Sequence, residues 1–514
     1  MKKILYHGFI NHNQNVIDIL NKKYNWKPVV NVSIEKDKRW FEKNFSNFSF
    51  LDIPSLRRFE FEKFLNKIKI NSINIDELDL LNVHKVGYFG SFDETKIGNF
   101  SLRELKNLFI EYLSFWKSIL IEKKVDIVIF LNWPHRSDCY SLYLIAKYVL
   151  KLDVLFIDQT PHLDKYYQTI GKDLNQLHLP FMKHYLNGTF KKNNQNVEEY
   201  VNKLKKKQTL KVDVEYIINR SKINIFFDFI KRFTKVFILT LLRGEGFKKP
   251  LIFLKKNTNY YKSSSYLMNN FEYLFFCLKK NIQTKKLKKY YEKNCTESEN
   301  NENYVLFAAP FQPEVNTNAL VGNSEDVITC LEMISKLIPK DWKIYYKEHF
   351  STFLTNDYNR SSLIKDKNYY ERIKKINNIR FISSKESIYE LIKKSKVTAS
   401  VSGTSSFEAA INEIPSISFG NCWYMGCKSI LTINSFQDLK KAFEKINNGF
   451  KPSIDDIYNY LYAISSSSIK ELTYYKHTFD RKKISEDELK SKSSVLADFL
   501  YSKYNEYYPD NEKI

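Results

Sequence analysis

The order of hydrophobic and polar positions predicts that the N-terminal part of the chain alternates between strands and helices. Residues 2–8 and 26–33 have the composition of strands, and apolar residues at helical spacing lie between them over 15–23. A longer amphipathic helix over 101–124 leads into a nearly continuous apolar run at 125–131, which is typical of a buried parallel strand. This alternation predicts an open parallel sheet covered by helices.

Polar side chains follow the apolar run at 125–131 and end the strand expected over 154–158. Open α/β sheets bind ligands at the carboxyl ends of their strands. We therefore expect His135, Arg136 and Asp158 to line the acceptor side of a cleft. The alternative is that this loop carries a helix cap and a histidine that merely fills space.

The same alternation returns in the C-terminal part, where it predicts a doubly wound parallel sheet. The strands are expected over 304–309, 342–346, 379–382, 397–401 and 416–419. Residues 37–62 are rich in aromatic and charged side chains without a clean period, so no element is assigned there.

A chain of 514 residues is too long for one hydrophobic core. We expect an α/β protein with two Rossmann-like, doubly wound domains, the first over 1–196 and the second over 304–448. A basic helical insertion and linker would occupy 197–303, and a helical tail would occupy 449–514. The first domain would bind the acceptor and the second a nucleotide.

The net charge of +23 favours a polyanionic partner or an anionic membrane surface. Nucleic acid is not expected, because the sequence has no zinc-ligand spacing, RNP-like motif or helix-turn-helix. The apolar segment at 223–242 is interrupted by charges, so it is expected to lie on a membrane surface or to form a buried helical arm. The six scattered cysteines indicate reduced thiols. We expect a cytoplasmic protein, peripheral on the inner face of the cytoplasmic membrane.

The segment 397–424, VTASVSGTSSFEAAINEIPSISFGNCWY, predicts a strand, a turn, a helix and a second strand. Its glycine permits a positive φ in the turn. Hydroxyl and backbone N–H groups at the start of a helix can hold an anion such as a nucleotide phosphate. The alternative is an ordinary capped turn. The turn residues are Ser402, Gly403, Thr404, Ser405 and Ser406.

Two further polar clusters follow neighbouring strands and should converge on the same crevice as this turn. Lys347 and His349 can bind phosphate, and Glu314, close to Gln312, can act on a reacting sugar carbon or its leaving group. The Walker A and GxGxxG patterns are absent from the sequence, which argues against an ATPase or a dinucleotide enzyme.

Three motifs together resemble the capsule polysaccharide biosynthesis glycosyltransferases, which are GT-B-fold enzymes related to bacterial Kdo transferases and to CMP-sialic acid transferases. They are QPE at 312–314, KEH at 347–349 and SGTSSFEA with the following P and FGNCWY at 402–424. The resemblance covers 304–424 and extends to VDIVIFLNWPHR and FIDQT at 125–160. It implies a GT-B-like fold in which the two domains face a cleft.

The resemblance also implies roles for individual residues. They are Gln312 and Glu314 as catalytic residues facing the donor sugar, Lys347 and His349 at the nucleotide phosphate, Ser402, Gly403, Thr404, Ser405 and Ser406 as a second nucleotide contact, and Glu408 at the ribose or base.

The implied activity is transfer of a CMP-activated acidic sugar such as Kdo to a glycan or lipid-linked glycan acceptor. The nucleotide sugar is a co-substrate, and neither a metal ion nor another cofactor is expected. One alternative is a glycerophosphotransferase that uses CDP-glycerol. Another is a non-catalytic GT-B-like protein that binds polyanions, because Asn316 and Phe350 depart from the family's pattern.

Overall fold

The computed structural model describes residues 1–9, 13–46, 48–65, 68–85, 88, 101–159, 167–174, 179–206, 270–299, 301–313, 326–355, 359–470 and 485–509. The chain forms two compact units. The first comprises residues 1–92, 98–200 and 459–514, and the second comprises 93–97 and 201–458.

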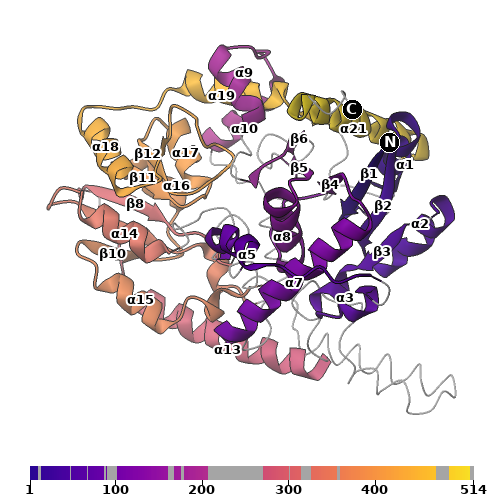
Figure 1. The fold of residues 1–514 in the computed structure, drawn as a ribbon. Coiled ribbons are helices and arrows are strands. Elements are labelled where there is room, and N and C mark those ends of the chain that lie inside the picture. Colours follow the sequence, from indigo (N-terminus) through magenta and orange to yellow (C-terminus); the bar gives the residue numbers. More distant parts are fainter. Residues whose placement is uncertain are drawn as a thin grey trace, which may run out of the picture. The chain divides into compact units, whose positions relative to one another are not determined.

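The first unit contains a seven-stranded sheet with the order β14-β6-β5-β4-β1-β2-β3. All neighbouring strands pair in parallel except β5 with β6 and β6 with β14. The chain adds β2 and β3 on one side of β1 and then returns to add β4 on the other (Figure 1). The topological switch point, where such sheets bind ligands, therefore lies between β1 and β4. The strands are β1 Lys2–His7, β2 Trp26–Ser33, β3 Ser49–Asp52, β4 Ile127–Phe130, β5 Asp153–Gln159, β6 Tyr167–Gly171 and β14 Ile469–Lys470.

One face of this sheet is covered by α1 and by the last helix of the chain. Ile4 and Ile127 share a buried cluster with Leu20 of α1 and Leu500 of α21. The two helices lie side by side (Figure 1). The rings of Tyr24 and Tyr501 stack between them, 3.9 Å apart. The helices are α1 Gln14–Tyr24, α2 Lys38–Asn44, α3 Ile53–Arg57, α4 Glu62–Leu65, α5 Ile75–Leu80, α7 Leu102–Glu122, α8 Ser137–Leu144, α9 Leu179–Asn187, α10 Gln195–Lys205 and α21 Glu486–Tyr507, with a π-helical turn at Ile145–Val149 after α8.

The second unit has a parallel seven-stranded sheet with the order β13-β12-β11-β8-β9-β10-β7. From β8 the chain adds β9 and β10 on one side, then crosses to add β11, β12 and β13 on the other. Its switch point therefore lies between β8 and β11. The strands are β7 Cys295–Thr296, β8 Tyr304–Ala308, β9 Lys343–Lys347, β10 Ile379–Ile382, β11 Val397–Ser400, β12 Ser416–Ser418 and β13 Leu431–Thr432.

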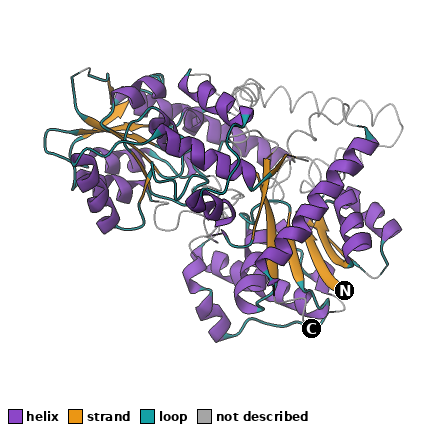
Figure 2. Cartoon of the chain, turned by 90° about the horizontal axis from the view of Figure 1, so that it is seen from above, coloured by secondary structure: helices purple, strands orange, loops and turns teal. Residues whose placement is uncertain are grey.

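Helices cover both faces of the second sheet, as the nearly unbroken apolar strands require (Figure 2). Val305 and Phe307 pack with α13, α14, α15 and α18, whereas Tyr304 and Leu306 pack with α16 and α17. The helices are α13 Asn270–Lys293, α14 Val327–Ser335, α15 Lys367–Lys374, α16 Ile388–Lys394, α17 Ser405–Ile411 and α18 Phe436–Asn447. The next helix, α19 Ile454–Ser466, begins in the second unit and continues into the first unit from residue 459.

The fold class predicted from the sequence, α/β with two Rossmann-like parallel sheets, is confirmed. Within the range predicted as an insertion, 197–303, α13 contributes Leu287 and Tyr291 to the core of the second unit. The predicted tail returns to the first unit through α21. None of the helices in the described ranges combines the length and apolar character needed to cross a membrane. The apolar segment at 223–242 lies outside those ranges.

Candidate functional site

The carboxyl ends of three strands meet at the switch point of the second sheet. Ala308, at the end of β8, pairs with Ser400 at the end of β11 and with Lys347 at the end of β9. The loops after β8 and β9 are tied together as well, because Ser361 Oγ donates a hydrogen bond of 2.6 Å to the carbonyl oxygen of Gln312. The structure thus brings the described residues of the predicted clusters after β8, β9 and β11 to one edge of one sheet.

Glu348, immediately after β9, is a buried carboxylate whose surroundings are complete. Burial by itself would raise its pKa, but the Lys365 ammonium and hydrogen bonds from tyrosine hydroxyls hold the pKa below its ordinary value. Since five donors fill the two oxygens, this group stabilises the loop and is not open to a ligand. The donors are Lys365 Nζ at 2.8 Å, Tyr370 OH at 2.7 Å, Tyr346 OH at 2.8 Å, Thr352 Oγ1 at 3.1 Å and the backbone N–H of His349 at 2.9 Å.

The imidazole of His349 is neutral and can donate one hydrogen bond. Burial lowers its pKa to about 4, although the neighbouring Glu348 acts in the opposite direction, so the imidazole carries no charge at pH 7. Its Nδ1 accepts the backbone N–H of Ser351 at 3.2 Å, which places the proton on Nε2. Within the described residues Nε2 has no partner, and it can donate to a phosphate oxygen.

Lys347 was predicted to bind phosphate together with His349, but its ammonium is already engaged. Its Nζ donates to the carbonyl oxygen of Ser384 at 3.1 Å, and Ser384 follows β10, on the far side of β9 from β8. Burial lowers the pKa of Lys347, while Glu386 and Glu292 oppose that shift. The cation therefore lies among carboxylates at the end of β10.

Internal hydrogen bonds fix the turn between β11 and α17. Ser406 Oγ lies 2.7 Å from Ser400 Oγ and 2.7 Å from the carbonyl oxygen of Ile417, so its hydroxyl belongs to the core. Tyr424 OH donates to the carbonyl oxygen of Gly403 at 2.7 Å. Hydrogen bonds within the segment 397–424 therefore hold the turn in one conformation.

Ser405 differs from its neighbour Ser406. It is half-buried, and its hydroxyl has no partner within the described part of the chain. Glu408, one turn further along α17, has its pKa raised by burial, and only the Thr404 hydroxyl opposes this. Gly403 does not use the positive φ that a glycine permits at this position. An added Cβ would meet Ser400 Cβ at an ordinary 3.7 Å.

The structure describes only one of the two predicted catalytic residues, Gln312 and Glu314. Gln312 is buried and its carbonyl is held by Ser361. Glu314 and Asn316 lie outside the described residues.

In the first unit, the loop after β4 carries two of the predicted acceptor residues. His135 Nδ1 lies 2.6 Å from the carbonyl oxygen of Trp133, and burial, together with Arg136, lowers the pKa of His135 to about 3. Arg136 Nε is buried without a partner among the described residues. Asp158 lies in β5, and its side chain falls outside the described part of the chain.

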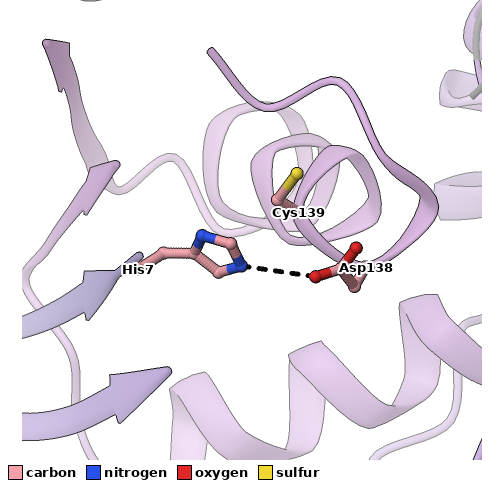
Figure 3. Close-up of side chains that lie close together, drawn as sticks. All are labelled: His7, Asp138 and Cys139. Carbon is pink, nitrogen blue, oxygen red and sulfur yellow. Dashed lines mark ion pairs between the residues drawn. The ribbon is translucent and has the colours of Figure 1, made fainter. Parts of the chain in front are cut away.

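A charged centre that the sequence does not predict lies beside this loop. His7 ends β1, and its Nε2 lies 3.5 Å from Asp138 Oδ2 at the start of α8 (Figure 3). Arg57 Nε binds the other oxygen of Asp138 at 3.1 Å. Applying the strand-end rule to the first strand would have identified His7. No local signal marked Arg57, which lies in the stretch 37–62 that has no clean period.

A surface cavity of about 680 Å³ lies elsewhere in the first unit, between α9 and the end of α19. Its lining includes His184, Lys191, Asn194 and Ser466, and none of the predicted site residues. The cavity is therefore not part of the candidate site.

The fold and the two polar centres define an α/β protein with two Rossmann-like units, each with polar side chains at its switch point. No known family profile and no curated protein matches the chain. Among solved structures it is similar to UDP-GlcNAc 2-epimerase from Methanocaldococcus jannaschii, at 16% identity over 87% of this chain and 93% of that one, with a TM-score of 0.24.

The chain is also similar to KpsC, a beta Kdo 2,7 transferase from Thermosulfurimonas dismutans, at 10% identity over 76% of this chain and 97% of that one, with a TM-score of 0.27. A family 9 glycosyl transferase from Veillonella parvula matches at 8% identity over 96% of this chain and 97% of that one, with a TM-score of 0.19. At such low scores the function has to be argued from the residues of the site.

Proposed function

We propose that the protein is a nucleotide-sugar-dependent glycosyltransferase of surface or capsular polysaccharide synthesis. Its donor would be a CMP-activated acidic sugar such as Kdo. The nucleotide would bind at the switch point between β8 and β11. The observation that carries the proposal is the meeting of three polar loops where Ala308, Ser400 and Lys347 end adjacent strands.

The charge of the site supports a CMP-sugar in particular. The phosphate of a CMP-sugar is a diester with a single negative charge, whereas a nucleoside diphosphate sugar carries two. His349 and Ser405 offer neutral donors, and the nearby Lys347 cation is engaged at Ser384. Neutral donors at close range suit a singly charged phosphate, whereas a diphosphate usually needs a cation or a metal ion.

The remaining roles follow from the strand-end positions and from the family resemblance. Gln312 and Glu314 would face the donor sugar, with Glu314 acting at the reacting carbon. Glu408 would reach the ribose or base. The acceptor, a glycan or a lipid-linked glycan, would bind to the first unit near His135, Arg136 and Asp158. The basic middle of the chain would keep the enzyme at an anionic membrane surface.

Thermal unfolding of the full-length protein tests the nucleotide site. Millimolar CMP should raise the unfolding temperature, because a ligand present at 100 times its Kd stabilises the folded state by about 2.7 kcal/mol. His349→Ala and Ser405→Ala should reduce that rise. Ser406→Ala is the matched control, since its hydroxyl is bound inside the fold, and it should keep the full rise.

Two results would count against the proposal. Protection by CDP-glycerol without protection by CMP would favour the glycerophosphotransferase. No protection by CMP, CDP-glycerol, UDP-N-acetylglucosamine or CMP-Kdo would favour a protein that does not use nucleotides.

A further inference from the structure

The charged centre of the first unit lies at the switch point of its own sheet. His7 is the last residue of β1, and Asp138 follows β4, the strand beside β1 on the other side of the switch. Gly8 comes directly after His7 with φ +84°, so the extended conformation of β1 ends at this histidine. The position is the one where open α/β sheets present side chains to a ligand.

Asp138 is held so that it can orient His7. Arg57 binds both of its oxygens, through Nε at 3.1 Å and Nη2 at 3.3 Å. Burial alone would raise the pKa of Asp138, but Arg57 and His7 hold the pKa well below its usual range. The carboxylate therefore remains ionised and fixed while Oδ2 faces the imidazole.

The imidazole of His7 approaches Asp138 through Nε2 at 3.5 Å, and among the described residues neither ring nitrogen makes a hydrogen bond. Nε2 faces Asp138, and the second ring nitrogen, Nδ1, points away from it (Figure 3). Among the described residues Nδ1 has no hydrogen-bond partner. The residue is 8% exposed, so the ring is largely shielded from water. An imidazole oriented by a buried carboxylate, with its other nitrogen unused, is the arrangement of a general base.

Unused hydrogen-bond donors lie in the same loop. Trp133 Nε1 and Arg136 Nε are both buried, and within the described residues neither has a partner. Buried donors that stay unsatisfied cost stability, so an acceptor that reaches this loop would be bound favourably. Hydroxyl and carboxylate oxygens of a sugar would provide such acceptors.

A metal site is a poorer account of this cluster. The side-chain ligand atoms of His7, Asp138 and Cys139 lie within 4.8 Å of one another. However, Arg57 occupies the carboxylate, and burial together with Asp138 raises the pKa of Cys139 to about 12, so the thiol keeps its proton. Cys139 Sγ is also hydrogen-bonded to the backbone of Arg136.

We propose that His7 is the general base that deprotonates the acceptor hydroxyl, with Asp138 as its positioning residue and Arg57 holding Asp138. This inference rests on the proposed function and names the residue that activates its acceptor. The acceptor oxygen forms its bond to the reacting carbon of the donor as its proton passes to Nδ1. The bond between that carbon and the phosphate oxygen breaks, and its electron pair leaves with CMP. Asp138 stabilises the imidazolium that results.

The test uses the full-length protein with CMP-Kdo as donor and water as acceptor, and it measures CMP release above spontaneous hydrolysis. His7→Ala should lower the turnover number at least 100-fold. Millimolar imidazole should restore part of the rate, which it would not do if His7 were only structural. Asp138→Asn should lower the turnover number about 10- to 100-fold with the KM for CMP-Kdo unchanged. His84→Asn, in the same unit, should match the wild type.

The rise in unfolding temperature with CMP distinguishes a failure of this inference from a failure of the proposed function. If His7→Ala keeps the full rise in unfolding temperature with CMP but loses CMP release, His7 is supported as the general base. CMP release within three-fold of the wild type in His7→Ala overturns it, and the nucleotide site then still stands. Stoichiometric Zn²⁺ binding that is lost in His7→Ala also overturns it, in favour of a metal site. Loss of CMP protection in the wild type overturns the proposed function itself.

Discussion

Each of the two units has a buried carboxylate paired with a buried cation at the carboxyl ends of parallel strands. The two carboxylates differ in their other hydrogen-bond partners. In the second unit Glu348 is paired with Lys365, and its oxygens accept from four further donors. In the first unit Asp138 is paired with Arg57 and faces His7, whose second nitrogen has no partner among the described residues.

The difference separates a structural pair from a functional one. A buried ion pair whose hydrogen bonds are all made holds loops in place and has no atom left for a substrate. In the first unit the carboxylate faces an imidazole whose Nδ1 has no hydrogen-bond partner among the described residues. A substrate can bind to this nitrogen. We therefore assign Glu348 to the framework of the proposed nucleotide site, and His7 remains the proposed general base.

The largest expected effect comes from breaking the structural pair. Lys365→Met leaves Glu348 as an uncompensated buried charge and should lower the free energy of unfolding by about 3–5 kcal/mol. Urea unfolding measures the loss. Lys340→Met, at an exposed position of the same unit, is the control and should change stability by less than ~0.5 kcal/mol. Equal losses in the two variants would contradict the framework role of Glu348.

A smaller effect should separate the two neighbouring serines of the turn. Ser406→Ala leaves the Ile417 carbonyl and the Ser400 hydroxyl without their partner and should cost about 1–3 kcal/mol of stability. Ser405→Ala should cost less than ~0.5 kcal/mol and weaken CMP binding instead. Denaturation and CMP titration of both variants check this, and the reverse pattern would exchange the two roles.

Lowering the pH should reduce the stability of the second unit, because it protonates Glu348. Its folded pKa lies below the ordinary value of 4.5, so its contribution is complete above that pH and is lost as pH falls through the folded pKa. One such group gives a slope of at most ~1.4 kcal/mol per pH unit. Urea unfolding of the wild type and Glu348→Gln between pH 6 and pH 3 should show a steeper decline in the wild type. Parallel declines would mean that Glu348 does not titrate in this way.

The smallest effect is expected at Gly403. Because its φ is not positive and an added Cβ meets only ordinary contacts, Gly403→Ala should be neutral or stabilise the fold by up to ~1 kcal/mol. Differential scanning calorimetry measures the change. A loss of more than ~1 kcal/mol would show that the turn needs glycine after all.

The sequence predicts most of the fold but only part of the polar centres. Long periodic or apolar segments are predicted well, and the bounds of β2 and β10 agree with the structure. The edge strand β3 is four residues long and lies in an aperiodic stretch, and β6 is antiparallel, so the rule of alternating strand and helix does not predict either.

Tertiary structure decides the rest of the site. The pair of Arg57 and Asp138 joins residues 81 apart, with no local pattern to connect them. Lys347 was a reasonable candidate for phosphate from its place at a strand end, yet its flexible side chain extends to Ser384 on the neighbouring strand's loop. Strand-end position can be read from the sequence, whereas the direction of a long side chain depends on its neighbours.

The central claim is that a nucleotide binds where β8, β9 and β11 end. Hydrogen–deuterium exchange of the full-length protein, with and without millimolar CMP, tests this claim most directly, because each peptide reports its own protection. We predict slower exchange in the peptides that contain residues 347–353 and 400–408, with no change in those of α13. Protection confined to peptides of the first unit, or no protection at all, would contradict the claim.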